Sequence, residues 1–321
     1  MKNKIILVGG DPNSINSEII AKSWKKLNNY QKKRIFLITN YKLINAQIKY
    51  LKLPLKVKKV LNLDHEIKGK YLKVIDLSLN FKKPFEVSGK SASKFVLNSL
   101  NLAHKLAQRK DVSGVINCAI NKNLLNRNKI GVTEYLAHKC GVKNNSEVML
   151  IHNNKLSVCP VTTHIDIKQV SKKLYSNLII KKIKTINTWF NQKFNRKPKI
   201  GVLGLNPHNA ENRKNTEEKK AIEPAIQKLK KANVKIRGPL AADTIFIKDY
   251  KKFDVIVGMY HDQVLGPFKT LFKYDAINIT LGLKYLRLSP DHGTAVSIIK
   301  KNKADPLSLI RCFNFIKKFS K

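Results

Sequence analysis

Three histidines occupy the same kind of place in the sequence. His164, His208 and His261 each stand just after an apolar segment that is typical of a buried strand. In open α/β sheets ligands bind beyond the carboxyl ends of the strands, so these imidazoles are expected at one edge of a sheet. Three neutral imidazoles suit a divalent metal ion that keeps open positions for a substrate and polarises its oxygen. For any one of the three, a structural role is the competing interpretation.

Other polar side chains follow the last of these histidines. Lys269, Asn278 and Arg287 interrupt an otherwise apolar stretch. Lys269 could equally be an ordinary surface residue, because the chain is rich in lysine. Arg287 is harder to explain in that way, since only 8 of the 63 basic residues are arginine. Cations beside a metal ion would suit a substrate that carries a phosphate or a carboxylate.

The elements that must position these residues alternate along the chain. Short β-branched runs are separated by segments with helical spacing of apolar residues, such as 91–108 and 215–232, with Asn215 as the expected cap of the latter. The lysine-rich segment 168–196 is expected to form one or two solvated helices. Such alternation predicts an α/β protein with a largely parallel sheet. The expected strands are 5–8, 34–38, 112–116, 147–151, 157–160, 199–205 and 253–259.

The net charge first suggests a nucleic-acid partner. The chain has 321 residues and a formal charge of +42. However, the excess is lysine spread over the whole chain together with abundant asparagine and isoleucine, which is what an AT-rich genome encodes. Recognition of phosphates and guanine edges relies more on arginine. We therefore expect no nucleic-acid partner, and binding that is absent at physiological salt would remove that alternative.

Nothing in the sequence suggests a membrane or an oxidising compartment. No apolar run approaches the roughly 18 residues of a membrane-spanning helix. The apolar segment 5–8 is more typical of a first buried strand than of a signal peptide. The cysteines, at positions 118, 140, 159 and 312, lack metal-finger or redox spacing, so buried thiols are expected. We expect a cytoplasmic protein without a membrane partner.

Two nucleotide-binding motifs are missing. G-x-G-x-x-G does not occur, so a dinucleotide would bind without the usual fingerprint. The triplet Gly89-Lys90-Ser91 resembles the end of a P-loop, but Pro84 stands where that loop requires its first glycine. The triplet is therefore expected to be a turn and a helix cap.

Longer segments occur in an order that matches a known family. They are GGDP at 9–12, AINK at 119–122, TE at 133–134, VTTH at 161–164, GLNPH at 204–208, GPLAADT at 238–244, MYHDQ at 259–263, NITLGL at 278–283 and SPDHGTA at 289–295. On these segments, nearly the whole chain resembles the 4-hydroxythreonine-4-phosphate dehydrogenases of vitamin B6 biosynthesis.

The resemblance implies a fold similar to that of isocitrate and isopropylmalate dehydrogenases. Two α/β/α domains with mostly parallel sheets would surround a central cleft. We place the first domain at residues 1–125 plus 285–321, and the second, which carries the metal ligands, at 126–284. The resemblance also implies a homodimer whose active site is shared across the interface.

The resemblance further implies the ligands and the residues that hold them. His164, His208 and His261 would bind a zinc, magnesium, cobalt or manganese ion, with His164 reaching the site of the neighbouring subunit. Thr133, Lys269, Asn278 and Arg287 would contact a small phosphorylated substrate. The implied cofactor is NAD, for which Asn206 and Asp243 are the candidate contacts.

The implied reaction is the NAD-dependent oxidation of 4-phosphohydroxy-L-threonine in pyridoxal 5'-phosphate biosynthesis. The metal would lower the pKa of the substrate hydroxyl, and the β-keto acid formed would decarboxylate to 3-amino-2-oxopropyl phosphate. Lys269 is the candidate for proton transfer, provided that a nearby cation lowers its pKa.

Some positions depart from the family pattern. Val132 stands in the segment Gly-Val-Thr-Glu, where the family has a histidine that helps to hold the substrate. The segments 13–17 and 209–213 are also less glycine-rich than usual. These changes leave the metal ligands intact but leave open the exact substrate and the choice between NAD and NADP. A sister enzyme acting on another phosphorylated hydroxy acid or a diol carboxylate is therefore the main alternative, and a non-catalytic relative is another.

Overall fold

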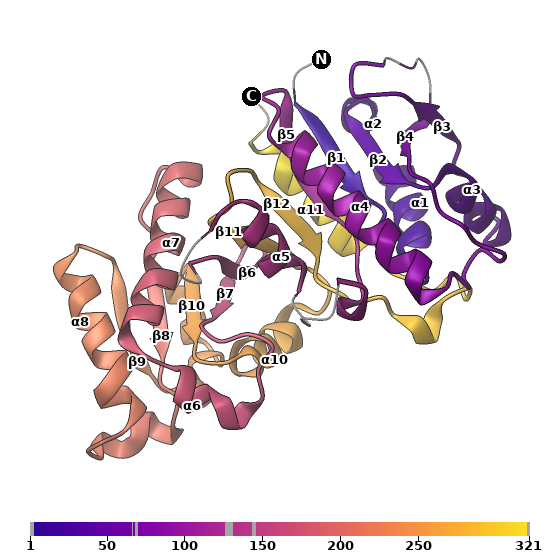
Figure 1. Cartoon of the computed structure of the whole chain (residues 1–321). Coiled ribbons are helices and arrows are strands. Elements are labelled where there is room, and N and C mark those ends of the chain that lie inside the picture. Colours follow the sequence, from indigo (N-terminus) through magenta and orange to yellow (C-terminus); the bar gives the residue numbers. More distant parts are fainter. Residues whose placement is uncertain (1–2, 66, 68–69, 126–130, 143–145, 320–321) are drawn as a thin grey trace. The chain divides into compact units, whose positions relative to one another are not determined.

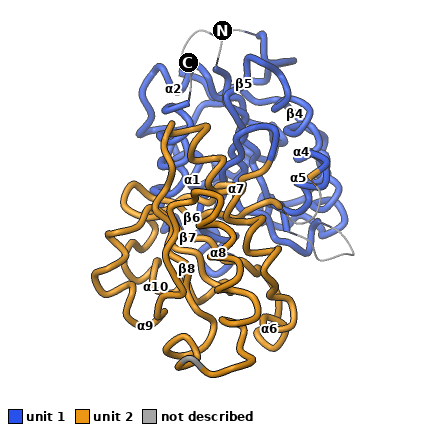
Figure 2. Tube along the Cα trace, turned by 90° about the vertical axis from the view of Figure 1, so that its left-hand side faces the viewer, with its two compact units in different colours: residues 1–141, 283–321 blue, residues 142–282 orange. Residues whose placement is uncertain are grey.

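The computed structural model describes residues 3–65, 67, 70–125, 131–142 and 146–319, which form two compact units (Figure 2). Unit 1 comprises Met1–Gly141 and Leu283–Lys321, and unit 2 comprises Val142–Gly282. The boundaries expected from the sequence, after residues 125 and 284, differ from these. The first of them adjoins residues 126–130, which lie outside the described residues. Helix α5 (Val132–Lys139), expected in the second domain, belongs to unit 1.

Unit 1 is built on a parallel sheet with the strand order β3-β4-β2-β1-β5-β12. All residues of β1 and β2 are buried, because helices cover the sheet and the strands are apolar apart from Lys4 and Thr39 at their ends. The strands are β1 (Lys4–Val8), β2 (Ile35–Thr39), β3 (Val57–Val60), β4 (Leu72–Asp76), β5 (Val112–Asn117) and β12 (Arg287–Pro290).

Helix α4 (Gly89–Ala107) packs against β1, β2 and β5, and α11 (Leu307–Lys317) packs against β5 and β12 (Figure 1). The apolar residues of α4 that have helical spacing are buried, as predicted. The cap is Ser88, whose hydroxyl accepts a hydrogen bond from the Ser91 N–H, so the expected turn at 89–91 is instead the first turn of the helix. The other helical segments are α1 (Asn16–Lys26), α2 (Asn29–Lys32), α3 (Tyr41–Tyr50), η1 (Lys122–Leu125) and η6 (Val296–Ile298).

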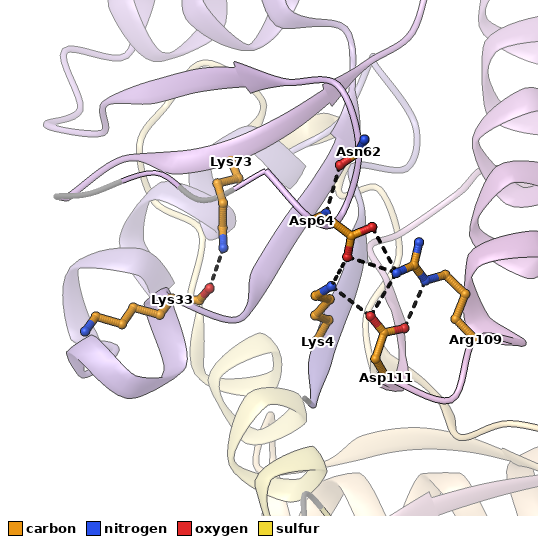
Figure 3. A network of polar contacts seen from close by, with 7 residues as sticks. All are labelled: Lys4, Lys33, Asn62, Asp64, Lys73, Arg109 and Asp111. Atoms are coloured by element: carbon orange, nitrogen blue, oxygen red, sulfur yellow. Dashed lines mark hydrogen bonds and ion pairs between the residues drawn. The ribbon is translucent and has the colours of Figure 1, made fainter. Parts of the chain in front are cut away.

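A polar network fastens the amino ends of β1 and β5 in unit 1 (Figure 3). The buried Lys4 places its Nζ 2.7 Å from carboxylate oxygens of both Asp64 and Asp111. Arg109 closes the network, with Nε 2.9 Å from Asp111 and Nη2 3.0 Å from Asp64. Burial by itself would lower the pKa of Lys4, but the two carboxylates raise it. The hydrogen bond from Arg109 holds the pKa of Asp111 well below its usual value.

Unit 2 has a mixed sheet with the strand order β11-β6-β7-β10-β8-β9. β6 is antiparallel to both of its neighbours, whereas β7, β10, β8 and β9 are mutually parallel. The predicted α/β class with largely parallel sheets is confirmed. The strands are β6 (Val148–His152), β7 (Ser157–Pro160), β8 (Ile200–Leu203), β9 (Ile236–Leu240), β10 (Val255–Gly258) and β11 (Ile277–Leu281).

Two helical segments of unit 2 differ from expectation. α7 (Ser176–Phe194) is amphipathic rather than simply solvated, because it buries a stripe that includes Ile179, Ile183 and Ile186. Asn215 has a left-handed backbone, with φ of 63°, and does not cap the next helix. That helix begins as a π-helical turn, η4 (Glu218–Ile222). The other segments are η2 (Ile167–Gln169), α6 (Val170–Lys173), η3 (Pro207–Asn212), α8 (Glu223–Lys231), α9 (Ala242–Ile245), η5 (Asp249–Lys252) and α10 (His261–Phe272).

The cysteines of the chain form no disulfide. All four cysteines are buried and unpaired, as expected, and burial raises the pKa of Cys159 to about 12. Within the described ranges, no helix is both long enough and apolar enough to cross a membrane.

Candidate active site

The three predicted metal ligands follow three adjacent strands of unit 2. β10 lies between β7 and β8, and all three run parallel, so their carboxyl ends lead to His261, His164 and His208 at the same edge. The rings of His164 and His261 lie with their centroids 5.7 Å apart. This separation is compatible with two imidazoles bound to one ion through bonds of about 2.0–2.1 Å. The described residues nevertheless contain no group of three potential ligands gathered for a metal, so His208 is not brought to this pair.

Two of these histidines stand on left-handed backbone. The φ angles of His164 and His208 are 50° and 49°. His208 begins a run of four non-glycine residues with positive φ, which continues through Asn209, Ala210 and Glu211. This conformation costs a residue with a Cβ roughly 1–2 kcal/mol. Such strain persists only where the surrounding structure imposes it, and it is concentrated at functional sites.

Hydrogen bonds tie the loops after the three strands together. The Thr162 hydroxyl donates to the Met259 carbonyl at 2.7 Å, which joins the His164 loop to the end of β10. The Gln263 side chain joins the end of β10 to the His208 loop, because it contacts both the Met259 N–H and the Gly204 carbonyl, each at 2.7 Å. The backbone leading to all three histidines is therefore connected by side chains as well as by the sheet.

Glu218 fixes the turn that precedes His208. Its carboxylate is fully buried, and Oε1 accepts hydrogen bonds from the N–H groups of Leu205 and Asn206, both at 2.8 Å. Oε2 accepts a third from Nδ2 of Asn206 at 2.9 Å. Burial alone would raise the pKa of Glu218, but these donors hold it below its ordinary value. The carboxylate is consequently ionised at neutral pH.

A carboxylate also orients His261. Its Nδ1 lies 2.7 Å from Oδ1 of Asp262. When Nδ1 carries the proton, it donates a hydrogen bond to that oxygen, and the lone pair of Nε2 is then available to a metal. A histidine and carboxylate in this arrangement are a common support for metal ligands.

The remaining predicted residues of unit 2 lie on α10 and β11. Lys269 is exposed in the last turn of α10, the helix that His261 begins. Asn278 lies on β11, and its Oδ1 is buried without a hydrogen-bond partner in the described structure. A buried acceptor of this kind is costly unless a donor reaches it, so it is suited to a hydrogen bond from a ligand.

Arg287 and Thr133 meet within unit 1. Arg287 is buried at the start of β12, where its Nε donates to Oδ1 of Asn117 at 2.7 Å and its Nη1 donates to Oγ1 of Thr133 at 3.3 Å. Burial lowers the pKa of Arg287 to about 10, so the guanidinium remains charged at neutral pH. The structure thus joins two of the predicted substrate contacts. Val132 is the first residue of α5, next to Thr133, and offers no hydrogen bond from its side chain.

The two candidate NAD contacts, Asn206 and Asp243, differ in their surroundings: Asn206 is hydrogen-bonded to neighbouring side chains, and Asp243 is exposed. Asn206 uses Nδ2 to contact both Glu217 and Glu218, so its oxygen is the group left to meet a cofactor. Asp243 is exposed in the first turn of α9. A cavity of about 450 Å³ lies at the opposite, amino end of β8 and β9, and none of the predicted site residues line it.

The contacts also identify supporting residues that the sequence interpretation missed. Gln263, Glu218 and Asn117 each hold a predicted site residue or the loop that carries one. Gln263 lies two residues after His261, and Glu218 is the second of two adjacent glutamates. A buried partner cannot be recognised from either pattern alone, because the groups they bind are distant in the sequence.

Comparisons with known proteins agree with the resemblance. Residues 31–316 match the family model described as pyridoxal phosphate biosynthetic protein PdxA. The 4-hydroxythreonine-4-phosphate dehydrogenase of Sulfurihydrogenibium sp. (strain YO3AOP1) is 37% identical over 316 residues, covering 96% of this chain and 95% of the relative. The putative D-threonate 4-phosphate dehydrogenase of Oceanobacillus iheyensis is 32% identical over 318 residues, covering 95% and 94%.

A solved structure supports the same relationship. The crystal structure of 4-hydroxythreonine-4-phosphate dehydrogenase from Klebsiella pneumoniae matches with a TM-score of 0.86 and 27% identity, covering 100% of this chain and 98% of that one. The likeness therefore extends over the whole chain in both sequence and fold. This chain belongs to the PdxA family of pyridoxal phosphate biosynthetic proteins, as its sequence segments predicted.

Proposed function

We propose that this chain catalyses the NAD-dependent oxidation of 4-phosphohydroxy-L-threonine to a β-keto acid, which then decarboxylates to 3-amino-2-oxopropyl phosphate. Family membership over most of the chain supports a dehydrogenase of pyridoxal phosphate biosynthesis. The observation that carries the chemical assignment is the ring contact between His164 and His261 beyond two adjacent strands. A pair of imidazoles at the ligand-binding edge of a sheet suits metal-assisted chemistry on a hydroxyl group.

His164, His208 and His261 are assigned to one divalent ion, which is zinc, magnesium, cobalt or manganese. The first and last of these already lie at a suitable separation, and His208 follows the neighbouring strand. When bound there, the ion supplies a Lewis acid that lowers the pKa of a substrate hydroxyl. The contact of Asp262 with Nδ1 of His261 supports this role, because it directs Nε2 toward a ligand.

The other assigned residues bind the substrate and move protons. Arg287, with Thr133 beside it, provides a fixed cation and a hydroxyl for an anionic group. The unpartnered oxygen of Asn278 accepts a hydrogen bond from the substrate. Oxidation removes a hydride from the carbinol carbon and a proton from its hydroxyl, and bound NAD would supply the acceptor for the hydride. Lys269 is assigned to proton transfer, and Asn206 and Asp243 to contacts with the cofactor.

A second activity of the same family is a specific alternative. The relative named as a putative D-threonate 4-phosphate dehydrogenase is 32% identical over nearly the same length. Val132, which replaces the histidine of the family pattern, removes one polar contact from the neighbourhood of Thr133. D-Threonate 4-phosphate carries a hydroxyl where 4-phosphohydroxy-L-threonine carries its amino group, so a changed polar contact bears directly on this choice.

The active form is proposed to be a cytoplasmic homodimer. The family resemblance implies that His164 serves the site of the partner subunit. The ring contact between His164 and His261 lies within one chain, and it therefore makes this sharing a testable part of the proposal. Hybrid dimers distinguish a shared site from one that a single chain builds.

The decisive assay measures NADH formation by the purified chain with either substrate. We expect turnover of 4-phosphohydroxy-L-threonine that is abolished by a chelator and restored by zinc, cobalt, manganese or magnesium. A higher kcat/KM with D-threonate 4-phosphate would favour the alternative. If neither NADH nor NADPH forms from 4-phosphohydroxy-L-threonine with metal present, the biosynthetic assignment is wrong.

A further inference from the structure

The Gln263 side chain connects two segments that lead to different histidines. Its Oε1 accepts a hydrogen bond from the Met259 N–H at 2.7 Å, and its Nε2 donates one to the Gly204 carbonyl at 2.7 Å. Met259 lies just before His261, and Gly204 lies just after β8 on the way to His208. One amide group therefore connects the segment that leads to His261 with the segment that leads to His208.

The position of this bridge is important because the sheet cannot make the same connection. β10 and β8 are parallel neighbours, and their pairing ends at Val257 and Val202. Beyond that pair, the chain continues from β10 into α10 and from β8 into η3. The Gln263 amide accepts a hydrogen bond from the segment after β10 and donates one to the segment after β8, as the backbone of an additional strand residue would. It thus extends the fixed spacing of the strands to the loops.

Two glycines leave space for the side chains that hold these loops. A Cβ on Gly258 would lie 2.9 Å from Oε1 of Gln263 and 2.5 Å from Cγ1 of Val264. On the other side, a Cβ on Gly204 would lie 3.2 Å from Oε1 of Glu218 and 2.3 Å from Oδ1 of Asn209. Both glycines therefore allow side chains to pack directly on the chain, and any bulk there would displace the groups that hold the loops.

We propose that Gln263 is a positioning residue that sets the distance between His208 and His261 and thereby the affinity of the site for a divalent metal. The inference rests on the proposed metal-assisted function. Gln263 itself does not bind the metal, since both ends of its amide are occupied by backbone groups. Residues that orient metal ligands typically alter metal affinity or activity by about 10–100-fold when they are changed.

Two substitutions test the bridge. Gln263→Met keeps the length and the unbranched shape of the side chain but removes both hydrogen bonds. Gln263→Asn keeps the amide but is one methylene shorter, so it cannot reach both backbones. Gln227→Met is the matched control, because Gln227 is exposed on α8.

The measurements are metal affinity by titration of the metal-free protein with Co²⁺ or Zn²⁺, and kcat at saturating metal. We expect both Gln263 variants to bind metal about 10–100-fold more weakly, with a much smaller loss of kcat once metal saturates the site. Backbone exchange of the Met259 N–H should also become faster. The control should match the unsubstituted chain in all three measurements.

Distinct outcomes separate the two hypotheses. Folded Gln263 variants whose metal affinity stays within twofold of the original overturn the positioning role, while the proposed function stands. Failure of the unsubstituted chain to bind any of the metals overturns both. A fall in thermal stability of the metal-free protein with unchanged metal affinity assigns Gln263 a structural role only, and the inference is then wrong.

Discussion

Nε of Arg287 donates a 2.7 Å hydrogen bond to Oδ1 of Asn117, although 170 positions separate the two residues. This contact and the one to Thr133 fix the plane of a buried guanidinium. A lysine at this position retains the charge but not the fork of donors. We expect Arg287→Lys to reduce kcat/KM by about 100-fold, mainly through KM, because a bidentate anion contact is lost.

The control for this change is Arg237→Lys, at an exposed position in unit 2. Steady-state kinetics with 4-phosphohydroxy-L-threonine provide the measurement. A KM that is unaltered in Arg287→Lys would show that this residue supports the fold rather than the substrate.

Lys269 provides a test of proton transfer. It is exposed in the last turn of α10, so its replacement should not disturb the core. We expect Lys269→Ala to lower kcat by about 10²–10⁴-fold, the usual contribution of a general acid or base. Lys228→Ala on the exposed side of α8 should leave kcat unchanged. If Lys269→Ala raises KM but leaves kcat intact, Lys269 binds the substrate without transferring a proton.

Hybrid dimers test whether the site is shared between subunits. Under the shared arrangement, His164 of one chain works with His208 and His261 of the other. Mixing inactive His164→Ala and His208→Ala chains then produces one complete site per hybrid dimer, and up to about half of the activity per hybrid should return. Mixing His208→Ala with His261→Ala should restore nothing. Absence of activity in both mixtures would place all three ligands on one chain, in agreement with the contact between His164 and His261.

The network around Lys4 predicts a pH-dependent contribution to stability. The pKa of Asp111 is lowered in the folded state from its ordinary value of 3.8. Its stabilising effect is therefore complete above about pH 5 and is lost as the pH falls below 3.8 through the folded pKa. We expect Asp111→Asn to lower the free energy of unfolding by about 1–3 kcal/mol at pH 7, because buried Lys4 loses a partner.

Urea unfolding at several pH values measures this effect. The difference between Asp111→Asn and the original chain should shrink as the solution becomes acidic. The matched change Asp249→Asn removes an exposed ion pair with Lys252 and should have no measurable effect. An Asp111→Asn difference that is constant from pH 7 to pH 3 would contradict the electrostatic origin.

The left-handed run after His208 predicts a stabilising substitution. Glu211 is exposed and has a φ of 51°, which glycine adopts without steric cost. We expect Glu211→Gly to raise the free energy of unfolding by about 0.5–1 kcal/mol. Glu211→Ala removes the same carboxylate but keeps the Cβ, so it should not be stabilising. Equal unfolding midpoints for the two variants would show that the backbone is not strained at this residue.

The elements that could be predicted are those that a short sequence segment identifies by itself, such as a run of apolar residues. β1, β7 and β10 are mainly apolar runs that are buried throughout, and they were found within two residues of their ends. Five strands were not predicted, namely β3, β4, β9, β11 and β12. Of these, β3 and β9 are outer strands in their units' orders and contain lysine, arginine or proline. An outer strand hydrogen-bonds on one side only, so it tolerates such residues.

The site residues were easier to predict than the residues that hold them in place. His164 and His261 were predicted because each follows a recognisable strand, and the structure brings their rings together. The Gln263 contact joins residues 59 positions apart, and no sequence period connects them. The left-handed backbone of 208–211 was not predicted either. Histidine and asparagine are enriched at positive φ, but alanine and glutamate are not, so the run lacks the signal that glycines would give.

Unit 1 consists of two separate stretches of chain, and this has a consequence for the order in which the protein can fold during synthesis. β5 obtains its partner β12 only after all of unit 2 has been translated. At about 5–20 residues per second, one flank of β5 remains without its strand for on the order of ten seconds. Unit 2, whose chain is continuous, can complete its own sheet in that interval. Unit 2 can therefore fold before unit 1 is complete. Until β12 is synthesised, β5 is an unpaired edge strand to which chaperones can bind.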